Sequence, residues 1–132
     1  MCIVCLGDSV TKGVRQGLSV DQVFCGLLET RLKQVGNEVK VFNLGVGSDT
    51  TEGGLKRFER DVLAHRPTHA AIMFGLNDAY RPKADGPPLV ELDRYDQNLR
   101  EMIRLLRDRN IQPILMTSNP YLTAGTSSAC DR

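Results

Sequence analysis

The chain has 132 residues, the size of one domain, and its 41% hydrophobic and 25% charged residues are ordinary for a globular protein. It carries 17 basic and 16 acidic residues without a basic run, which argues against nucleic acid or an acidic membrane surface as a partner. No apolar stretch is long enough for a transmembrane segment, and an apolar run follows Met1 directly without a signal peptide, so we expect a cytoplasmic protein.

The first apolar run, residues 3–6, is typical of a buried strand, and the Gly-Asp-Ser sequence after it indicates a tight turn. Ser9 is therefore expected just past the carboxyl end of a buried strand, where open α/β sheets bind their ligands. Taken alone, the same three residues would also fit an ordinary turn with a capping serine.

Two cysteines of this first segment, Cys2 and Cys5, have the C-x-x-C spacing of redox and zinc sites. Positions three apart on a strand point to opposite faces, and no second C-x-x-C or C-x-x-H is present to complete a zinc site. We therefore expect these two, Cys25 and Cys130 to be reduced thiols, and we expect no metal.

Residues 11–18 are rich in glycine and polar residues and predict a loop. Ser19 and Gln22 fit a capping box that starts a helix, with apolar residues at helical spacing up to residue 35 and a stop at Gly36. Residues 39–42 predict a second strand. One helix between two strands indicates a βαβ unit with parallel strands.

The second strand ends in a glycine-rich segment, residues 43–51. Its Gly45-x-Gly47 pair suggests a dinucleotide site, but Thr50 stands where the third glycine would be, and the segment follows the second strand rather than the first. The plainer interpretation is a turn into the N-terminus of a helix over residues 52–64, whose free N–H groups favour an anion or a transient oxyanion.

Residues 69–74 predict a third buried strand that again ends in glycine and polar residues, at positions 75–78. Successive parallel strands point their ends the same way. Ser9, the turn at Gly47 and Ser48, and Asn77 are therefore expected to gather at one edge of the sheet.

The rest of the chain predicts a long loop at residues 80–89, a helix at 92–109 and a fourth strand at 113–117. The loop has three prolines and is long enough to form a lid or a pocket wall. We expect one domain over residues 1–122 and a poorly ordered tail over 123–132.

Three blocks, each after a predicted strand, carry a family resemblance: Gly-Asp-Ser-Val at residues 7–10, the segment 43–51, and Gly-Leu-Asn-Asp at residues 75–78. In this order, the blocks resemble those of the SGNH, or GDSL-type, hydrolases, and the match extends to about Tyr121. The resemblance implies a flavodoxin-like three-layer α/β/α fold with a parallel sheet. It also implies hydrolysis of an ester or related acyl bond of a small molecule, without a cofactor.

The resemblance further implies residue roles. Ser9 would be the nucleophile, and the oxyanion hole would be formed by the N–H of Ser9, an N–H of the second block and the side-chain amide of Asn77. The second-block donor aligns best with Ser48, with Gly47 as the alternative; a serine there would be strained if the site requires a positive φ. The supporting residues are Gly7, Asp8, Gly75 and Asp78, and the two aspartates are expected to accept backbone N–H groups.

One block of the family has no counterpart. The closing Asp-x-x-His supplies the base and its orienting acid, whereas here Asp131 is followed by Arg132. The two histidines, His65 and His69, are expected near the opposite edge of the sheet, with His69 roughly 20 Å from the site at about 3.3 Å per strand residue. The family's last strand and helix are also missing. We therefore expect a truncated hydrolase without catalytic His and Asp, weak or inactive, with an exposed sheet edge that could self-associate.

Three alternatives stay open. The first is a catalytically inert module that binds acyl groups or carbohydrates on the same fold. The second is a flavodoxin-like flavin-binding protein, which would need a better phosphate loop than Gly-Asp-Ser. The third is a fragment that receives its base from another chain.

Overall fold

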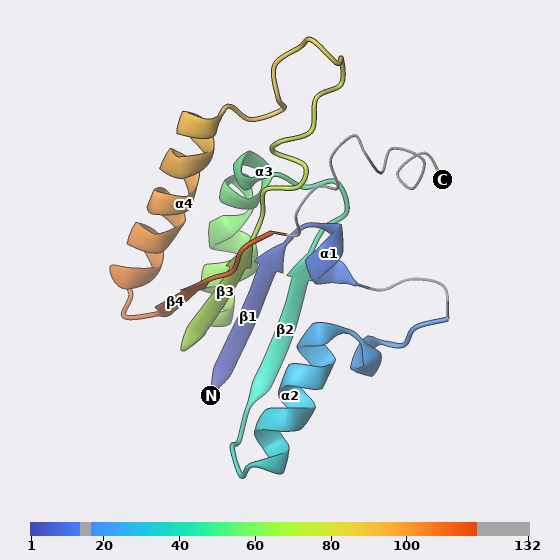
Figure 1. Cartoon of the computed structure of the whole chain (residues 1–132). Helices are drawn as coiled ribbons and strands as arrows, with labels where there is room; N and C mark the ends of the chain where they lie inside the picture. The colour runs from blue at the N-terminus through green and yellow to red at the C-terminus, as the bar shows by residue number, and fades with distance from the viewer. Residues whose placement is uncertain (14–16, 119–132) are drawn as a thin grey trace.

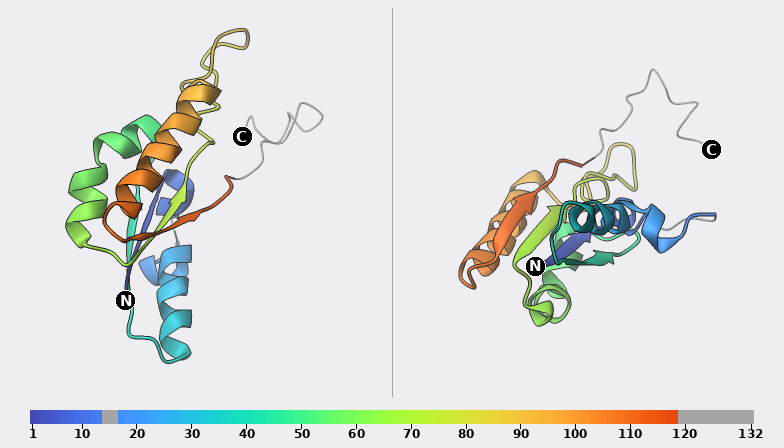
Figure 2. Two further views of the ribbon diagram at one scale, coloured as in Figure 1. Left: turned by 90° about the vertical axis from the view of Figure 1, so that its left-hand side faces the viewer. Right: turned by 90° about the horizontal axis from the view of Figure 1, so that it is seen from below.

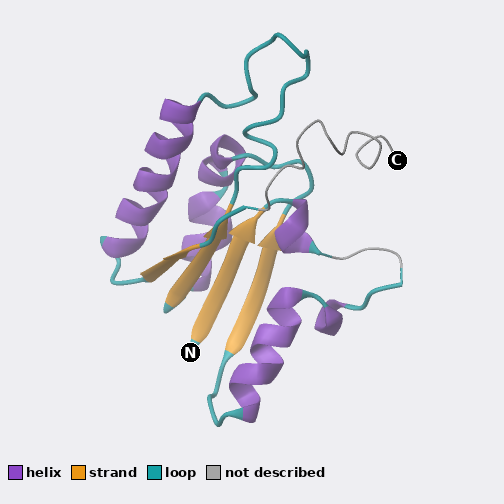
Figure 3. Cartoon of the chain, in the orientation of Figure 1, coloured by secondary structure: helices purple, strands orange, loops and turns teal. Residues whose placement is uncertain are grey.

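The computed structural model describes residues 1–13 and 17–118, so the expected tail over residues 123–132 lies outside the described part. The fold is built on a four-stranded parallel sheet with strand order β2-β1-β3-β4 (Figures 1 and 3). Its strands are β1 (Cys2–Gly7), β2 (Lys40–Gly45), β3 (His69–Met73) and β4 (Gln112–Leu115). Its helices are α1 (Ser9–Lys12), η1 (Val20–Gln22), α2 (Phe24–Gln34), α3 (Thr51–Lys56), η2 (Phe58–Val62), η3 (Leu63–His65) and α4 (Leu92–Arg107).

The strand register aligns the ends of the three strands that precede the sequence motifs. Gly7, the last residue of β1, is paired with Gly45 in β2 and with Met73 in β3. The segments that follow these strands therefore leave the sheet from one edge (Figure 1). This is the arrangement that the parallel strands predict.

Alternating side chains of β1 divide the apolar core into two layers. Val4 and Leu6 pack with residues of η2, β3 and α4, whereas Ile3 and Cys5 pack with Cys25 of α2. Figure 2 shows α2 on one face of the sheet and α3, η2 and α4 on the other. The expected three-layer α/β/α architecture with a parallel sheet is confirmed.

Several elements differ from their predicted bounds. The predicted loop at residues 11–18 begins instead with one helical turn, α1, directly after β1. The helix predicted to start at Ser19 is split into two. The capping box of Ser19 and Gln22 caps the start of the short η1, and α2 begins after Val23. The helix predicted over residues 52–64 is three consecutive segments, α3, η2 and η3, the middle one a π-helix.

The strand β4 forms one edge of the sheet, because among the described strands it pairs with β3 alone. Its side chains Ile114 and Leu115 are 44% and 54% exposed. The predicted exposed edge is therefore present, and self-association through it stays a prediction. Among the described residues, none of the helices combines the length and apolar character needed to span a bilayer.

Candidate active site

Ser9 is the first residue of α1 and lies at the edge where β1 ends, with its side chain exposed. The preceding residue, Asp8, is the N-cap: its Oδ1 accepts the N–H of Val10 at 2.8 Å. A Cβ on Gly45 of β2 would overlap the backbone of Lys12. The glycine that suggested a nucleotide site is thus required for the packing of α1, which presents Ser9.

Ser48 lies in a turn closed by the N–H of Asp49 donating to the carbonyl of Val46 at 3.3 Å. Its φ of 60° is in the left-handed region, so serine occupies a conformation that favours glycine, whereas Gly47 has no such φ. The N–H groups of Ser9 and Ser48 have no acceptor among the described residues. Both are therefore available to an oxygen atom that approaches from solvent.

Asn77 brings the three motifs together. Its Nδ2 donates to the backbone carbonyl of Asp49 at 2.8 Å and lies 3.4 Å from Oδ2 of Asp8. These two partners are the direct neighbours of Ser48 and Ser9. The short bond orients the amide, and a longer, weaker hydrogen bond directs the second N–H of Nδ2 to the carboxylate of Asp8, the residue before Ser9.

The side chain of Asp78 is hydrogen-bonded to Thr51 and so connects the third motif to α3. Its Oδ1 accepts the N–H of Thr51 at 3.0 Å and the hydroxyl of the same threonine at 2.5 Å. Asn98 of α4 donates from Nδ2 to the Thr51 oxygen at 3.0 Å, and all three side chains are buried. The aspartate accepts a backbone N–H, as Asp8 also does.

A buried ion pair lies beneath the second motif. Arg57, which follows α3, donates from Nε to Oδ2 of Asp49 at 2.9 Å, and its Nη2 lies 2.8 Å from the same oxygen. That nitrogen also donates to the carbonyl of Gly7 at 3.2 Å. Only 10% of each side chain of the pair is exposed. The guanidinium therefore links the end of β1 to the turn that contains Ser48.

Three carboxylates lie near this edge, and their arrangement affects the pKa of Asp8. Burial raises the pKa of Asp8, the negative charges of Asp78 and Asp49 raise it further, and the hydrogen bond from Val10 opposes the rise. Within the part of the chain that the structure describes, no three His, Cys, Asp or Glu side chains gather as metal ligands would.

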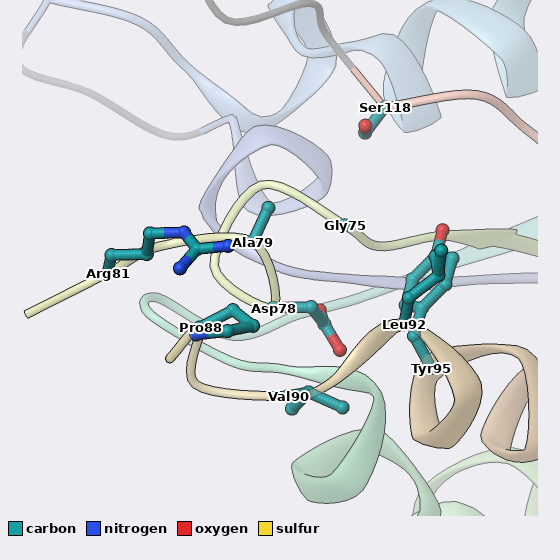
Figure 4. Close-up of a pocket in the computed structure, with 9 residues that line it drawn as sticks. All are labelled: Gly75, Asp78, Ala79, Arg81, Pro88, Val90, Leu92, Tyr95 and Ser118. Atoms are coloured by element: carbon teal, nitrogen blue, oxygen red, sulfur yellow. The ribbon is translucent and has the colours of Figure 1, made fainter. Parts of the chain in front are cut away.

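A cavity of about 420 Å³ adjoins the third motif. It is lined by Gly75, Asp78, Ala79, Arg81, Pro88, Val90, Leu92, Tyr95 and Ser118 (Figure 4). Figure 4 shows Leu92 and Tyr95 together on one side and Arg81 on the opposite side. The loop after the third motif thus supplies part of the wall through Arg81 and Pro88. The cavity borders the segment that carries Asn77, whereas Ser9 and Ser48 are not among its described lining residues.

Both histidines lie toward the amino ends of the strands. The His65 ring stacks on the Phe42 ring with centroids 4.2 Å apart, and the backbone carbonyl of His65 lies 3.8 Å from Sγ of Cys2. His69 opens β3 and is paired with Ile3, four residues before Gly7. At about 3.3 Å per residue this is roughly 13 Å of strand, which is beyond the reach of a general base.

Four residues of the site were missed by the sequence reasoning. Asp49 stands in the glycine-rich segment and Arg57 on the polar side of the predicted helix, so nothing in the pattern signals that they pair. Thr51 stands in the first turn of α3 like any polar residue there. Asn98 could have been found, because it lies three residues after Tyr95 on the buried face of α4.

The chain was compared with known proteins and structures. A model of the GDSL-like lipase/acylhydrolase family matches residues 5–131. The lipoprotein YqeF of Bacillus subtilis (strain 168) is 37% identical over 123 residues, which cover 91% of this chain and 49% of that protein. An arylesterase of Vibrio mimicus is 31% identical over 114 residues, which cover 86% of this chain and 52% of that protein.

A solved structure gives the same result. A lipolytic protein of the G-D-S-L family from Desulfitobacterium hafniense DCB-2 aligns with a TM-score of 0.76 at 26% identity, over 98% of this chain and 66% of that one. The chain spans about half the length of the two relatives given above. The family resemblance of the three motifs is confirmed, and the chain belongs to the GDSL-like lipase/acylhydrolase family.

Proposed function

We propose that this chain is a serine hydrolase that cleaves an ester or related acyl bond of a small molecule, with Ser9 as nucleophile. The observation that carries the proposal is the position of the Asn77 amide, held between the direct neighbours of Ser9 and Ser48. Acyl transfer requires a hydroxyl nucleophile and fixed donors aimed at one developing oxyanion. The proposal assigns these parts to the three motifs, which follow the ends of neighbouring strands.

In the proposed reaction, Oγ of Ser9 attacks the acyl carbonyl and loses its proton, and the carbonyl oxygen becomes an oxyanion. The oxyanion accepts from the N–H of Ser9, the N–H of Ser48 and the second N–H of Asn77, which exchanges its 3.4 Å bond to Asp8 for the oxyanion. Its collapse expels the alcohol, which takes up the proton, and leaves an acyl-Ser9 ester that water hydrolyses. Each preorganised donor of this kind contributes roughly 3 kcal/mol of transition-state stabilisation.

The proposed reaction also needs a group that accepts the proton of Ser9. Neither imidazole of residues 1–132 lies at the edge with Ser9, so among these residues a carboxylate, or else water, would take the proton. Fixed oxyanion donors still accelerate acyl transfer over water when a triad member is missing. We therefore expect slow hydrolysis that depends on Ser9.

The same position of the histidines favours a second candidate function, an inert module that binds an acyl or carbohydrate ligand on this fold. In that case the cavity of about 420 Å³ beside the third motif would hold the ligand, and Ser9 would have no role in turnover. The two functions differ in one measurable property, which is whether ester cleavage depends on the Ser9 hydroxyl.

The test is hydrolysis of p-nitrophenyl acetate by the purified chain and by its Ser9→Ala variant. We expect Ser9→Ala to abolish the hydrolysis above the buffer rate. The matched control is Ser19→Ala, an exposed serine in the capping box of η1, which should keep the wild-type rate. Equal rates for the wild type and Ser9→Ala would reject the hydrolase and leave the inert binding module.

A further inference from the structure

Arg57 is the buried cation of the site, and the mechanism above assigns it no part. Its guanidinium contacts two carboxylates and one backbone carbonyl: Asp49 at 2.8 and 2.9 Å, Asp61 at 3.3 Å and the carbonyl of Gly7 at 3.2 Å. The contact with Gly7 spans 50 positions in the sequence. A helix-surface arginine that merely paired with Asp61 would have no reason to be buried at this depth.

These contacts lie next to the proposed oxyanion donors. Asp49 follows Ser48 directly, and its backbone carbonyl is the 2.8 Å acceptor that orients Asn77. Gly7 stands two residues before Ser9, and its carbonyl also accepts the N–H of Val46 at 3.0 Å, at the start of the turn that contains Ser48. One guanidinium therefore fixes the second motif against the first, and through Asp49 it fixes the amide of the third.

We propose that Arg57 is a positioning residue, whose buried guanidinium holds Ser48 and Asn77 at the separation from Ser9 that a single oxyanion requires. The inference rests on the proposed function, because it assigns Arg57 to that same site. It adds a residue that touches none of the reacting atoms and acts through Asp49 and Gly7.

The geometry requires arginine rather than any cation. A guanidinium is a rigid planar fork with five N–H donors, so it binds a carboxylate and a carbonyl in fixed directions at the same time. Lysine carries the same charge on one flexible nitrogen and cannot reproduce the fork. Arg57→Lys therefore separates the effect of the charge from the effect of the geometry.

The experiment compares the wild type with Arg57→Lys, Arg57→Gln and a matched control, Arg60→Gln. Arg60 pairs with Asp61 as well, but its side chain is 77% exposed. We measure kcat and KM for the Ser9-dependent hydrolysis of p-nitrophenyl acetate, and circular dichroism reports folding. Both Arg57 variants should lower kcat at least tenfold with less than a twofold change in KM, and Arg60→Gln should leave both constants unchanged.

Either of two kinetic results would overturn the inference: wild-type kcat in folded Arg57→Lys, or a matching loss of kcat in Arg60→Gln. If Arg57→Gln does not fold, Arg57→Lys alone decides between these outcomes, because it keeps the charge of the buried pair.

A second measurement is independent of hydrolysis. The side-chain NH₂ of Asn77, assigned by NMR, should exchange slowly with solvent in the wild type, since one of its hydrogens is bonded to Asp49. We expect the exchange to be at least tenfold faster in Arg57→Lys and unchanged in Arg60→Gln. Unchanged exchange in Arg57→Lys would reject the positioning role. If the chain shows no Ser9-dependent hydrolysis, the proposed function fails, and this exchange measurement still decides whether Arg57 positions the amide.

Discussion

The carboxylate of Asp78 should stabilise the fold through its hydrogen bonds rather than through its charge. The side chain is buried, and Oδ1 accepts both the N–H and the hydroxyl of Thr51, the first residue of α3. Oδ2 is buried without a hydrogen-bond partner in the described part of the chain. Asp78→Ala removes both bonds, whereas Asp78→Asn keeps the Oδ1 acceptor and removes the charge.

The expected magnitudes follow from these contacts. A hydrogen bond without a charge contribution is worth about 0.5–1.5 kcal/mol, and each buried group of Thr51 that loses its acceptor costs about 1–3 kcal/mol. Removing a buried carboxylate with one unpartnered oxygen offsets part of that loss. We expect Asp78→Ala to lower the free energy of unfolding by about 3 kcal/mol, and Asp78→Asn to change it by less than about 1.5 kcal/mol.

The assay is urea denaturation of the wild type and both variants, followed by circular dichroism. With a slope of about 1.5 kcal/mol per molar urea, Asp78→Ala should unfold at a midpoint about 2 M lower than the wild type. The Asp78→Asn midpoint should shift by less than half as much. Equal midpoints for the two variants would refute the reasoning, because the loss could then not be assigned to the acceptor oxygen.

Two more predictions concern Gly45, which packs against α1, and Asp8, which precedes Ser9. Gly45→Ala should lower the free energy of unfolding by about 1–3 kcal/mol and displace Ser9, because the new Cβ would overlap the backbone of Lys12; an unchanged urea midpoint would contradict this. The raised pKa of Asp8 stabilises the wild type fully below the unfolded pKa of about 3.9, and this stabilisation is lost as the pH rises through the folded pKa. Asparagine does not titrate, so Asp8→Asn should become more stable relative to the wild type as the pH rises. Urea midpoints of both proteins from pH 3 to 7 would show this, and a constant difference across that range would disprove it.

The sequence predicted the sheet well because buried parallel strands have a strong local signal. Each of the four strands is a short apolar run, and three of the runs end in glycine or polar residues that mark the edge of the sheet. The helices were predicted less accurately. Leu92 and Val35 fit the apolar spacing of their helices, yet they are 75% and 74% exposed because they lie at helix ends.

The sequence alone predicts the position of some residues of the candidate site but not the contacts that hold them. Ser9, Ser48 and Asn77 follow the ends of strands, so the topology alone places them at one edge. The contacts that hold them are not local: Arg57 reaches Gly7 across 50 positions. Such a contact depends on the depth at which α3 and η2 pack, and the periodicity of one segment does not encode that depth.

The groups that bind the oxyanion and the group that would accept the proton depend on different parts of the fold. Every contact that joins the three motifs, from Arg57 on Gly7 to Asn98 on Thr51, lies between residues 7 and 98. This part is covered on both faces by helices, and its buried polar groups bind one another. The proposed nucleophile and its proposed donors are therefore held by residues that precede β4 in the chain, whereas β4 itself has an open edge. If these residues act as proposed, a base supplied beyond that edge should raise kcat without reordering Asn77.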